Sequence, residues 1–278
     1  MIEIRENIII ETTLSGVTVG AIKTPEGVIF IDSPILPKDV QFWRTMIMKN
    51  DCGPLRLHIL LDEHFDRTAC VVPIKSPVVA HEKTGKAIQN RPTTLRFSVS
   101  ATGGDWELYP EVGPIQWTNP EITFTQSIEI ELDEDPIKLD YHPGPARGAI
   151  WVSLPIQKVV FVGDAVVAGE PPFLENADID QWLEALELLK SNSYKGYTII
   201  SGRSGVIGKK EIQEQIRFLN LVRKRMEKFS AKTIGVEQLE KLTLNLLEAF
   251  PTPTKKLQEH YKARLNWGLS HYYSHSIH

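Results

Sequence analysis

The chain has 278 residues, 42% of them hydrophobic, and a formal net charge of −4. This charge argues against a nucleic-acid-binding protein, because binding to phosphates needs clustered Lys and Arg. The length allows one large domain or two small ones with a substantial core. Cys52 and Cys70 lie among apolar residues, which indicates buried thiols in a reducing compartment. No secretion signal and no membrane-spanning apolar run is present, so we expect a cytoplasmic protein that does not bind membranes.

The first third of the chain predicts strands that alternate with helices. Short apolar runs bounded by turn residues predict strands over residues 2–10, 17–31, 55–61 and 78–80. Apolar residues at helical spacing predict helices over residues 37–49 and 82–89. The turn Pro25-Glu26-Gly27 indicates that the first strands form an antiparallel meander. Strands that alternate with helices indicate an α/β fold.

Residues 91–120 have no clear periodicity. Trp106, Tyr109 and Trp117 lie there among several Gly and Pro residues. A segment of this length without a period is typical of a functional loop or lid, and equally of a flap that packs its aromatic rings on the sheet.

The second half of the chain predicts another sheet and a helical end. Alternating runs predict strands over residues 121–126, 128–132, 137–141, 149–154, 158–162 and 197–200. Asp178 is expected to cap an amphipathic helix, and three more helices follow Gly208. We therefore predict a first domain over residues 1–208 and a helical extension over 209–278, packed on that domain or used to form a homo-oligomer.

Ionisable residues gather directly after the apolar strand 55–61. Asp62, His64 and Asp66 alternate along the chain, so in an extended segment they point to one side, and Arg67 follows them. Taken alone, this pattern favours a capped turn, in which Asp62 or Asp66 accepts backbone N–H bonds as the chain leaves the strand.

Six segments together resemble a known family. The hexapeptide DEHFDR at 62–67 resembles the H-x-H-x-D-H signature of the metallo-β-lactamase fold superfamily, with the first and last His replaced. Five further landmarks of that family follow in its order, at residues 28–33, 77–82, 143–150, 159–164 and 199–205. The resemblance implies a four-layer αβ/βα sandwich of two mixed sheets with outer helices, here with a C-terminal helical extension.

The resemblance also implies two zinc ions that activate a hydroxide for hydrolysis. Carried over to this sequence, one metal would be held by Asp62, His64 and Pro145, the second by Asp66, Arg67 and Arg203, with Asp164 bridging both. Proline has no side-chain ligand atom, and arginine stays protonated and repels a cation. Four of the seven implied ligands are altered, so a dinuclear zinc hydrolase is not expected and no cofactor is predicted.

We expect Arg67 and Arg203 to pair with Asp66 and Asp164 and so to replace the second metal, unless Arg203 turns to solvent. The chain is then non-catalytic or repurposed to bind a partner or a small anionic ligand, with Arg67, Arg147 and Arg203 as the ligand-binding residues. If the site is catalytic, Asp66 and Asp164 are the candidate catalytic residues.

Two alternatives stay open. The first is a mononuclear metal-dependent hydrolase of an ester, thioester, lactone or lactam, in which Asp62, His64 and Asp164 hold one divalent zinc, manganese or iron ion. The second is a structural subunit that assembles through its C-terminal helices. The sequence leaves open whether the chain is an enzyme at all.

Overall fold

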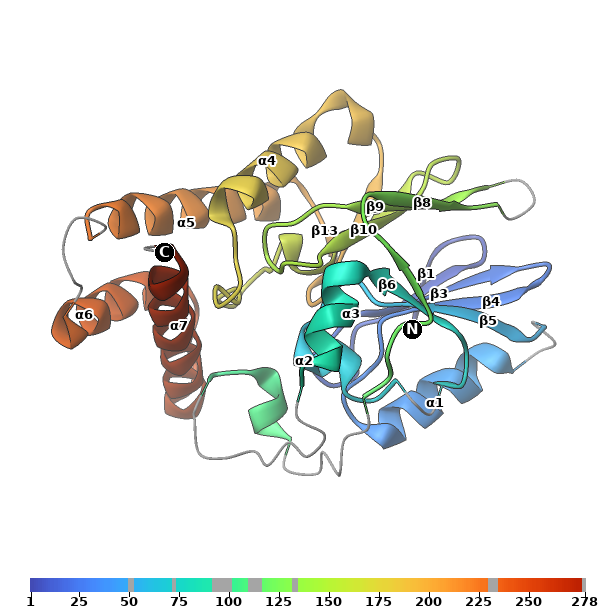
Figure 1. Ribbon diagram of the computed structural model, residues 1–278, viewed down its shortest axis with the longest axis horizontal. Coiled ribbons are helices and arrows are strands. Elements are labelled where there is room, and N and C mark those ends of the chain that lie inside the picture. Colours follow the sequence, from blue (N-terminus) through green and yellow to red (C-terminus); the bar gives the residue numbers. More distant parts are fainter. Residues whose placement is uncertain are drawn as a thin grey trace.

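The protein forms two facing sheets with helices outside them, as Figure 1 shows. The structure is a computed structural model, and it describes residues 1–49, 53–71, 74–91, 102–109, 117–131, 135–229 and 235–276. The predicted four-layer α/β sandwich is confirmed.

The first sheet has seven strands in sequence order. They are β1 (Ile2–Arg5), β2 (Ile8–Glu11), β3 (Val19–Thr24), β4 (Gly27–Ile31), β5 (Leu55–Ile59), β6 (Val78–His81) and β7 (Ile122–Phe124). The pairs from β1 to β4 are antiparallel, and those from β4 to β7 are parallel. Helices α1 (Pro37–Met48) and α3 (Glu82–Gln89) form the crossovers that parallel pairing requires.

The second sheet has six strands in the order β13-β12-β11-β10-β9-β8. They are β8 (Ser127–Ile130), β9 (Ile137–Tyr141), β10 (Ile150–Leu154), β11 (Val159–Phe161), β12 (Thr198–Ser201) and β13 (Gly205–Ile207). Only β11 and β12 pair in parallel, and helix α4 (Ile179–Lys190) connects them.

Apolar side chains fill the space between the sheets and the space beneath each helical layer. Ile10, Ile29 and Ile59 of the first sheet pack with Leu139 and Val152 of the second. Outside the first sheet, the buried face of α1 packs on β3 and β4. The burial of these faces is the main favourable contribution to folding.

Three helices follow β13 and pack at one end of the sandwich (Figure 1). They are α5 (Lys209–Glu227), α6 (Val236–Leu247) and α7 (Lys255–Ser276), and their apolar faces join the core beneath α4. The division into two domains at residue 208 stays a prediction. None of the helices that the structure describes is both long and apolar enough to cross a membrane.

Two strand predictions were wrong in detail. Residues 121–126 were assigned to the second sheet, but β7 pairs in parallel with β6 at the edge of the first. Strand β13 was missed because its three residues follow a Gly-rich turn and are too few to show a period. Cys70 is buried with a free thiol, whereas Cys52 lies outside the described residues, as do 92–101 and 110–116 of the segment predicted as a lid or flap.

Trp182 connects this core to the loop after β11. Its ring is fully buried, and its Nε1 donates to the Ala165 carbonyl over 2.7 Å. We expect Trp182→Ala to lower the free energy of unfolding by about 3–5 kcal/mol through the cavity it leaves. Trp182→Phe should cost about 1–3 kcal/mol, because it keeps most of the ring and loses the donor. Urea denaturation measures both, and a Trp182→Ala protein as stable as the wild type would contradict the prediction.

Candidate functional site

Acidic and basic side chains of both sheets meet at one edge of the sandwich. Asp32 follows β4 and Asp62 lies after β5, while Asp164 follows β11 in the short helix η3 (Gly163–Ala165) and Arg203 follows β12. In each sheet these strands are parallel neighbours, so their carboxyl ends lie at the same edge, where α/β proteins place their ligand sites. The short helix α2 (Phe65–Thr68) adds Arg67 and Asp66.

Arg67 is fully buried and is surrounded by three carboxylates. Its Nη1 lies 2.7 Å from Asp32 Oδ2, its Nε lies 3.0 Å from Asp62 Oδ1, and its Nη2 donates to Asp164 Oδ1. Burial lowers the pKa of Arg67, but these acids outweigh burial and raise it above its ordinary value. Arg67 is therefore a permanent cation inside the protein.

Arg203 is the second buried cation, with a side chain only 1% exposed. Its Nε donates to Asp164 Oδ2 over 2.9 Å, and its Nη1 lies 2.6 Å from Asp66 Oδ2 and 3.0 Å from Asp105 Oδ2. The guanidinium also stacks on Phe173, 4.7 Å from the ring centroid. Arg203 therefore pairs with carboxylates, as expected, and does not turn to solvent.

Asp164 connects the two arginines, because each of its oxygens accepts from one of them. Burial raises the pKa of Asp164, but Arg203 and Arg67 hold it well below its usual range. The pKa of Asp62 is also lowered, since Arg67 and His64 outweigh its burial. Burial dominates at Asp32 and raises its pKa to about 7 despite Arg67.

His64 faces the same carboxylates. Its Nδ1 lies 3.0 Å from Asp62 Oδ1 and 3.3 Å from Asp164 Oδ2, and its ring lies 5.3 Å from that of Phe173. Burial lowers the pKa of His64, but Asp62 and Asp164 outweigh it and raise the pKa to about 9. One ligand atom from each of Asp62, His64 and Asp164 lies within 4.8 Å of the others, so the structure brings the three predicted metal ligands together.

A third buried arginine, Arg264 of α7, extends this cluster and was missed from the sequence. It donates to Asp105 Oδ1, its Nη1 lies 2.8 Å from Glu170 Oε2, and it stacks 4.3 Å from the Phe173 ring centroid. Burial raises the pKa of Asp105, but Arg264, together with His260 and Arg203, lowers it to about 2. A single Arg in an amphipathic helix and an Asp in an aperiodic loop carry no sequence signal for such a pair.

The loop that carries Pro145 and Arg147 is held by Glu63, another residue whose role was missed. Glu63 is 7% exposed, and its carboxylate accepts from the backbone N–H of Arg147 over 2.9 Å and of Gly148 over 3.0 Å. Pro145 is buried, whereas the Arg147 side chain is exposed and lies outside the Asp164 cluster, lining a separate cavity. The roles assigned to Arg67, Arg147 and Arg203 in ligand binding, and to Asp66 and Asp164 in catalysis, stay predictions.

Comparisons with known proteins agree with this fold. The sequence model of the metallo-beta-lactamase superfamily matches residues 63–195. A metallo-beta-lactamase from Pontibacter korlensis is 17% identical, with a TM-score of 0.58 over 77% of this chain and 99% of that chain. A metallo-beta-lactamase family protein from Thermus thermophilus is 13% identical, with a TM-score of 0.66 over 99% of this chain and 95% of that chain.

A double mutant of the sec-alkyl sulfatase PisA1 is also 13% identical, with a TM-score of 0.70 over 99% of this chain and 50% of that chain. A search of curated proteins gave no match. The family match over residues 63–195 supports membership of the metallo-beta-lactamase superfamily, and the solved structures show the shared fold.

The residues present do not fit two zinc ions. At the implied second position, Arg67 and Arg203 place guanidinium groups against Asp66 and Asp164, and a guanidinium offers donors only. At the first position, Asp62, His64 and Asp164 supply one nitrogen and two oxygens, and the buried Asp62 Oδ2 has no hydrogen-bond partner among the described residues. That set fits one divalent ion, which would compete with the arginines for Asp164.

We expect Arg203→Ala to destabilise the protein by about 3–5 kcal/mol at neutral pH, because it leaves Asp66 and Asp164 buried with less compensation. In the wild type the pKa of Asp164 is depressed, so this residue adds stability above its unfolded-state pKa, which is lost as the pH falls through the folded-state value. The substitution raises that folded-state pKa. The deficit relative to the wild type should therefore be largest at neutral pH and shrink as the pH falls through the raised value.

Thermal melts of both proteins between neutral and acidic pH measure this difference. Arg203→Lys keeps the charge but loses the second donor group, so its melting temperature should lie between those of the wild type and Arg203→Ala. Arg44→Ala, at an exposed position on α1, is the control and should change little. Equal stability of Arg203→Ala and wild type at neutral pH would contradict a stabilising role of these ion pairs.

Proposed function

We propose that this chain is a metallo-beta-lactamase superfamily protein in which Arg67 and Arg203 replace the second metal and whose scaffold is repurposed for ligand binding. The observation that carries the proposal is that both oxygens of Asp164 accept from guanidinium groups. A bridging carboxylate engaged in this way has no free oxygen directed at a second ion.

The chemistry of the arginines supports a non-catalytic centre. In the metal-dependent reaction, the ion lowers the pKa of a bound water and so makes hydroxide available at neutral pH. A guanidinium compensates the same carboxylates but has no vacant orbital to bind water. Arg67 and Arg203 can therefore maintain the packing of this edge without supplying a nucleophile.

Ligand binding is best supported at Arg147 among the three predicted arginines. The N–H groups of Arg67 and Arg203 face carboxylates of the chain itself. The Arg147 guanidinium is exposed and forms no ion pair with the residues that the structure describes. A free guanidinium at a protein surface suits a carboxylate or phosphate group, so we propose a small anionic ligand.

The alternative is a mononuclear metal-dependent hydrolase that uses Asp62, His64 and Asp164. The proximity of their ligand atoms and the unpartnered Asp62 Oδ2 favour it. Bound zinc, manganese or iron would supply an activated water there, and these three side chains would hold the ion.

Cytoplasmic location and assembly through the C-terminal helices stay proposals. Val236 and Leu244 of α6 are 85% and 47% exposed, which supports a contact between copies of this chain.

Metal analysis separates the two functions. We expect protein purified without chelators to hold far less than one zinc, manganese or iron ion per chain, and added zinc not to activate hydrolysis of esters or lactams. Inductively coupled plasma mass spectrometry and a hydrolysis assay provide the measurement. One divalent ion per chain that is lost in Asp62→Asn, with turnover that a chelator abolishes, would overturn the proposal in favour of the mononuclear hydrolase.

Restoring ligands should create zinc affinity if the arginines occupy the metal position. The triple variant Arg67→His, Pro145→His and Arg203→His removes two cations and adds three imidazoles, so zinc should raise its melting temperature. The same zinc concentration should leave the wild type unchanged. A triple variant that folds, but whose melting temperature zinc does not raise, would count against the metal-replacing role of the arginines.

A further inference from the structure

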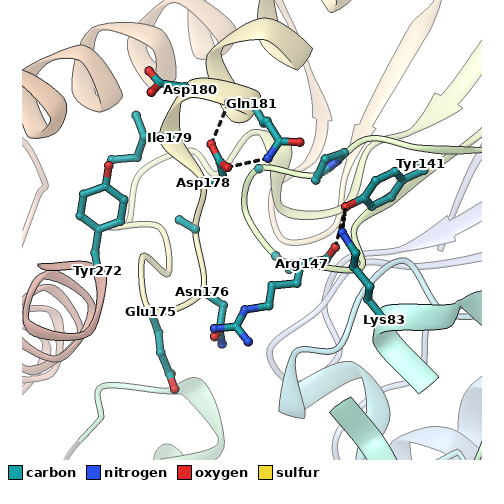
Figure 2. A pocket seen from close by; sticks show the side chains of 14 residues that line it. Lys83, Tyr141, Arg147, Glu175, Asn176, Asp178, Ile179, Asp180, Gln181 and Tyr272 are labelled. Atoms are coloured by element: carbon teal, nitrogen blue, oxygen red, sulfur yellow. Dashed lines mark hydrogen bonds between the residues drawn. The ribbon is translucent and has the colours of Figure 1, made fainter. Parts of the chain in front are cut away.

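A cavity of about 550 Å³ lies beside the loop that carries Arg147. One side consists of Lys83, Tyr141 and the loop from Pro143 to Arg147, and the other consists of residues 175–181 and Tyr272 (Figure 2). Among the described residues, its lining includes none of the buried acids that pair with Arg67 and Arg203. It is therefore a site separate from the buried ion-pair cluster.

Two cations of this cavity, Lys83 and Arg147, form no ion pair among the described residues. Lys83 Nζ donates to the Tyr141 hydroxyl over 2.6 Å, and that hydroxyl donates to the Arg147 carbonyl over 3.1 Å. Neither Lys83 nor Arg147 pairs with a carboxylate of the part of the chain that the structure describes. In Figure 2 the Arg147 side chain extends from its loop into the cavity.

Glu63 fixes the loop beneath Arg147. Its two oxygens accept from consecutive backbone N–H groups, those of Arg147 and Gly148, and Thr84 Oγ1 lies 3.4 Å from one of them. A loop held at its backbone loses less conformational entropy when its side chain binds a ligand. Glu63 is thus a positioning residue for Arg147.

The acids that line the cavity are engaged by other parts of the chain. Both oxygens of Asp178 accept from Gln181 at the start of α4, Asp180 pairs with Arg223 over 2.8 Å, and Glu175 accepts from Trp267 over 3.0 Å. Among the described residues they form no ion pair with Lys83 or Arg147, and their negative charge opposes a ligand with several negative charges.

We infer that this cavity binds a small organic monocarboxylate. Its carboxylate lies against Arg147, because a guanidinium fork matches two carboxylate oxygens, and its apolar body faces Ile179 and Tyr272. Lys83, on the same side of the cavity as the Arg147 loop, adds positive charge without contacting that carboxylate. The inference deepens the proposed ligand-binding function and rests on it.

Three probes of similar shape test the charge requirement: benzoate with one negative charge, benzamide with none and phthalate with two. Saturation-transfer NMR titrations of the full-length protein measure their affinities. We expect saturable benzoate binding with a Kd of about 1 mM or lower that weakens with added salt, and at least about tenfold weaker binding of benzamide and phthalate. Benzamide that binds as well as benzoate, or phthalate that binds more tightly, would overturn the monocarboxylate assignment.

Substitutions test the residues. Arg147→Met and Lys83→Met keep the aliphatic stems. Arg147→Met should weaken benzoate binding by roughly tenfold or more, and Lys83→Met should weaken it less, because Lys83 acts through its charge alone. Glu63→Gln should weaken benzoate binding less than Arg147→Met does, because Glu63 acts only by positioning the loop. It should leave the weak binding of benzamide unchanged. Arg44→Met removes an exposed arginine on α1 and should leave benzoate binding unchanged, so an equal loss in Arg44→Met would overturn the inference.

The two proposals fail in different ways. A protein that is free of metal and inactive as a hydrolase, yet binds no benzoate at millimolar concentration, overturns the monocarboxylate site alone. Zinc-dependent turnover in a protein whose benzoate affinity still depends on Arg147 overturns the metal-replacement proposal and leaves the cavity assignment standing.

Discussion

The carboxylate of Asp164 is the point on which this edge of the protein depends. It follows a strand of the second sheet, and its two oxygens accept from Arg67, next to the first sheet, and from Arg203, after the neighbouring strand of its own sheet. Burying an isolated charge costs much free energy. Asp164, Arg67 and Arg203 can therefore be buried only because the opposite charges compensate one another. The pairing therefore connects the two halves of the sandwich by charge, in addition to the apolar contacts between the sheets.

The same constraint extends to the C-terminal helices. Asp105 accepts from Arg203 with one oxygen and from Arg264 of α7 with the other, and both guanidiniums contact the Phe173 ring. Helix α7 thus contributes a cation to the cluster as well as an apolar face to the core. Displacing this helix would leave Asp105 with one fewer cation, which couples the helical end of the chain to the site edge.

The parts of the fold that were predictable from sequence are those with a repeated pattern. Apolar runs such as Val28–Ile31 and the spacing of Trp182, Leu186 and Leu189 on α4 indicate strands and helices regardless of what they pack against. The grouping of Asp62, His64 and Asp164 followed from the family motifs that these residues carry. Asp105 and Arg264 could not be found in this way, because they come from an aperiodic loop and a distant helix and meet only through tertiary packing. Glu63 was visible in the signature, but its role depends on a loop more than eighty residues further along the chain, at Arg147 and Gly148.

In the proposed function arginine replaces a metal, and this changes what the site needs from its surroundings. A metal centre is complete only while the ion is bound, and the free energy of ion binding then contributes to the stability of the folded protein. Arg67 and Arg203 are covalently part of the chain and remain charged at every physiological pH, so the carboxylates are compensated as soon as the protein folds. If the arginines replace the second metal, the same permanence removes an open coordination position on which hydrolysis by a metal-bound water depends. A protein built in this way keeps the rigid strand ends of its superfamily, and those ends hold Glu63 and the loop of Arg147 in a fixed position. Under the proposed function, the buried cluster supports a neighbouring binding cavity and is not itself the reactive centre.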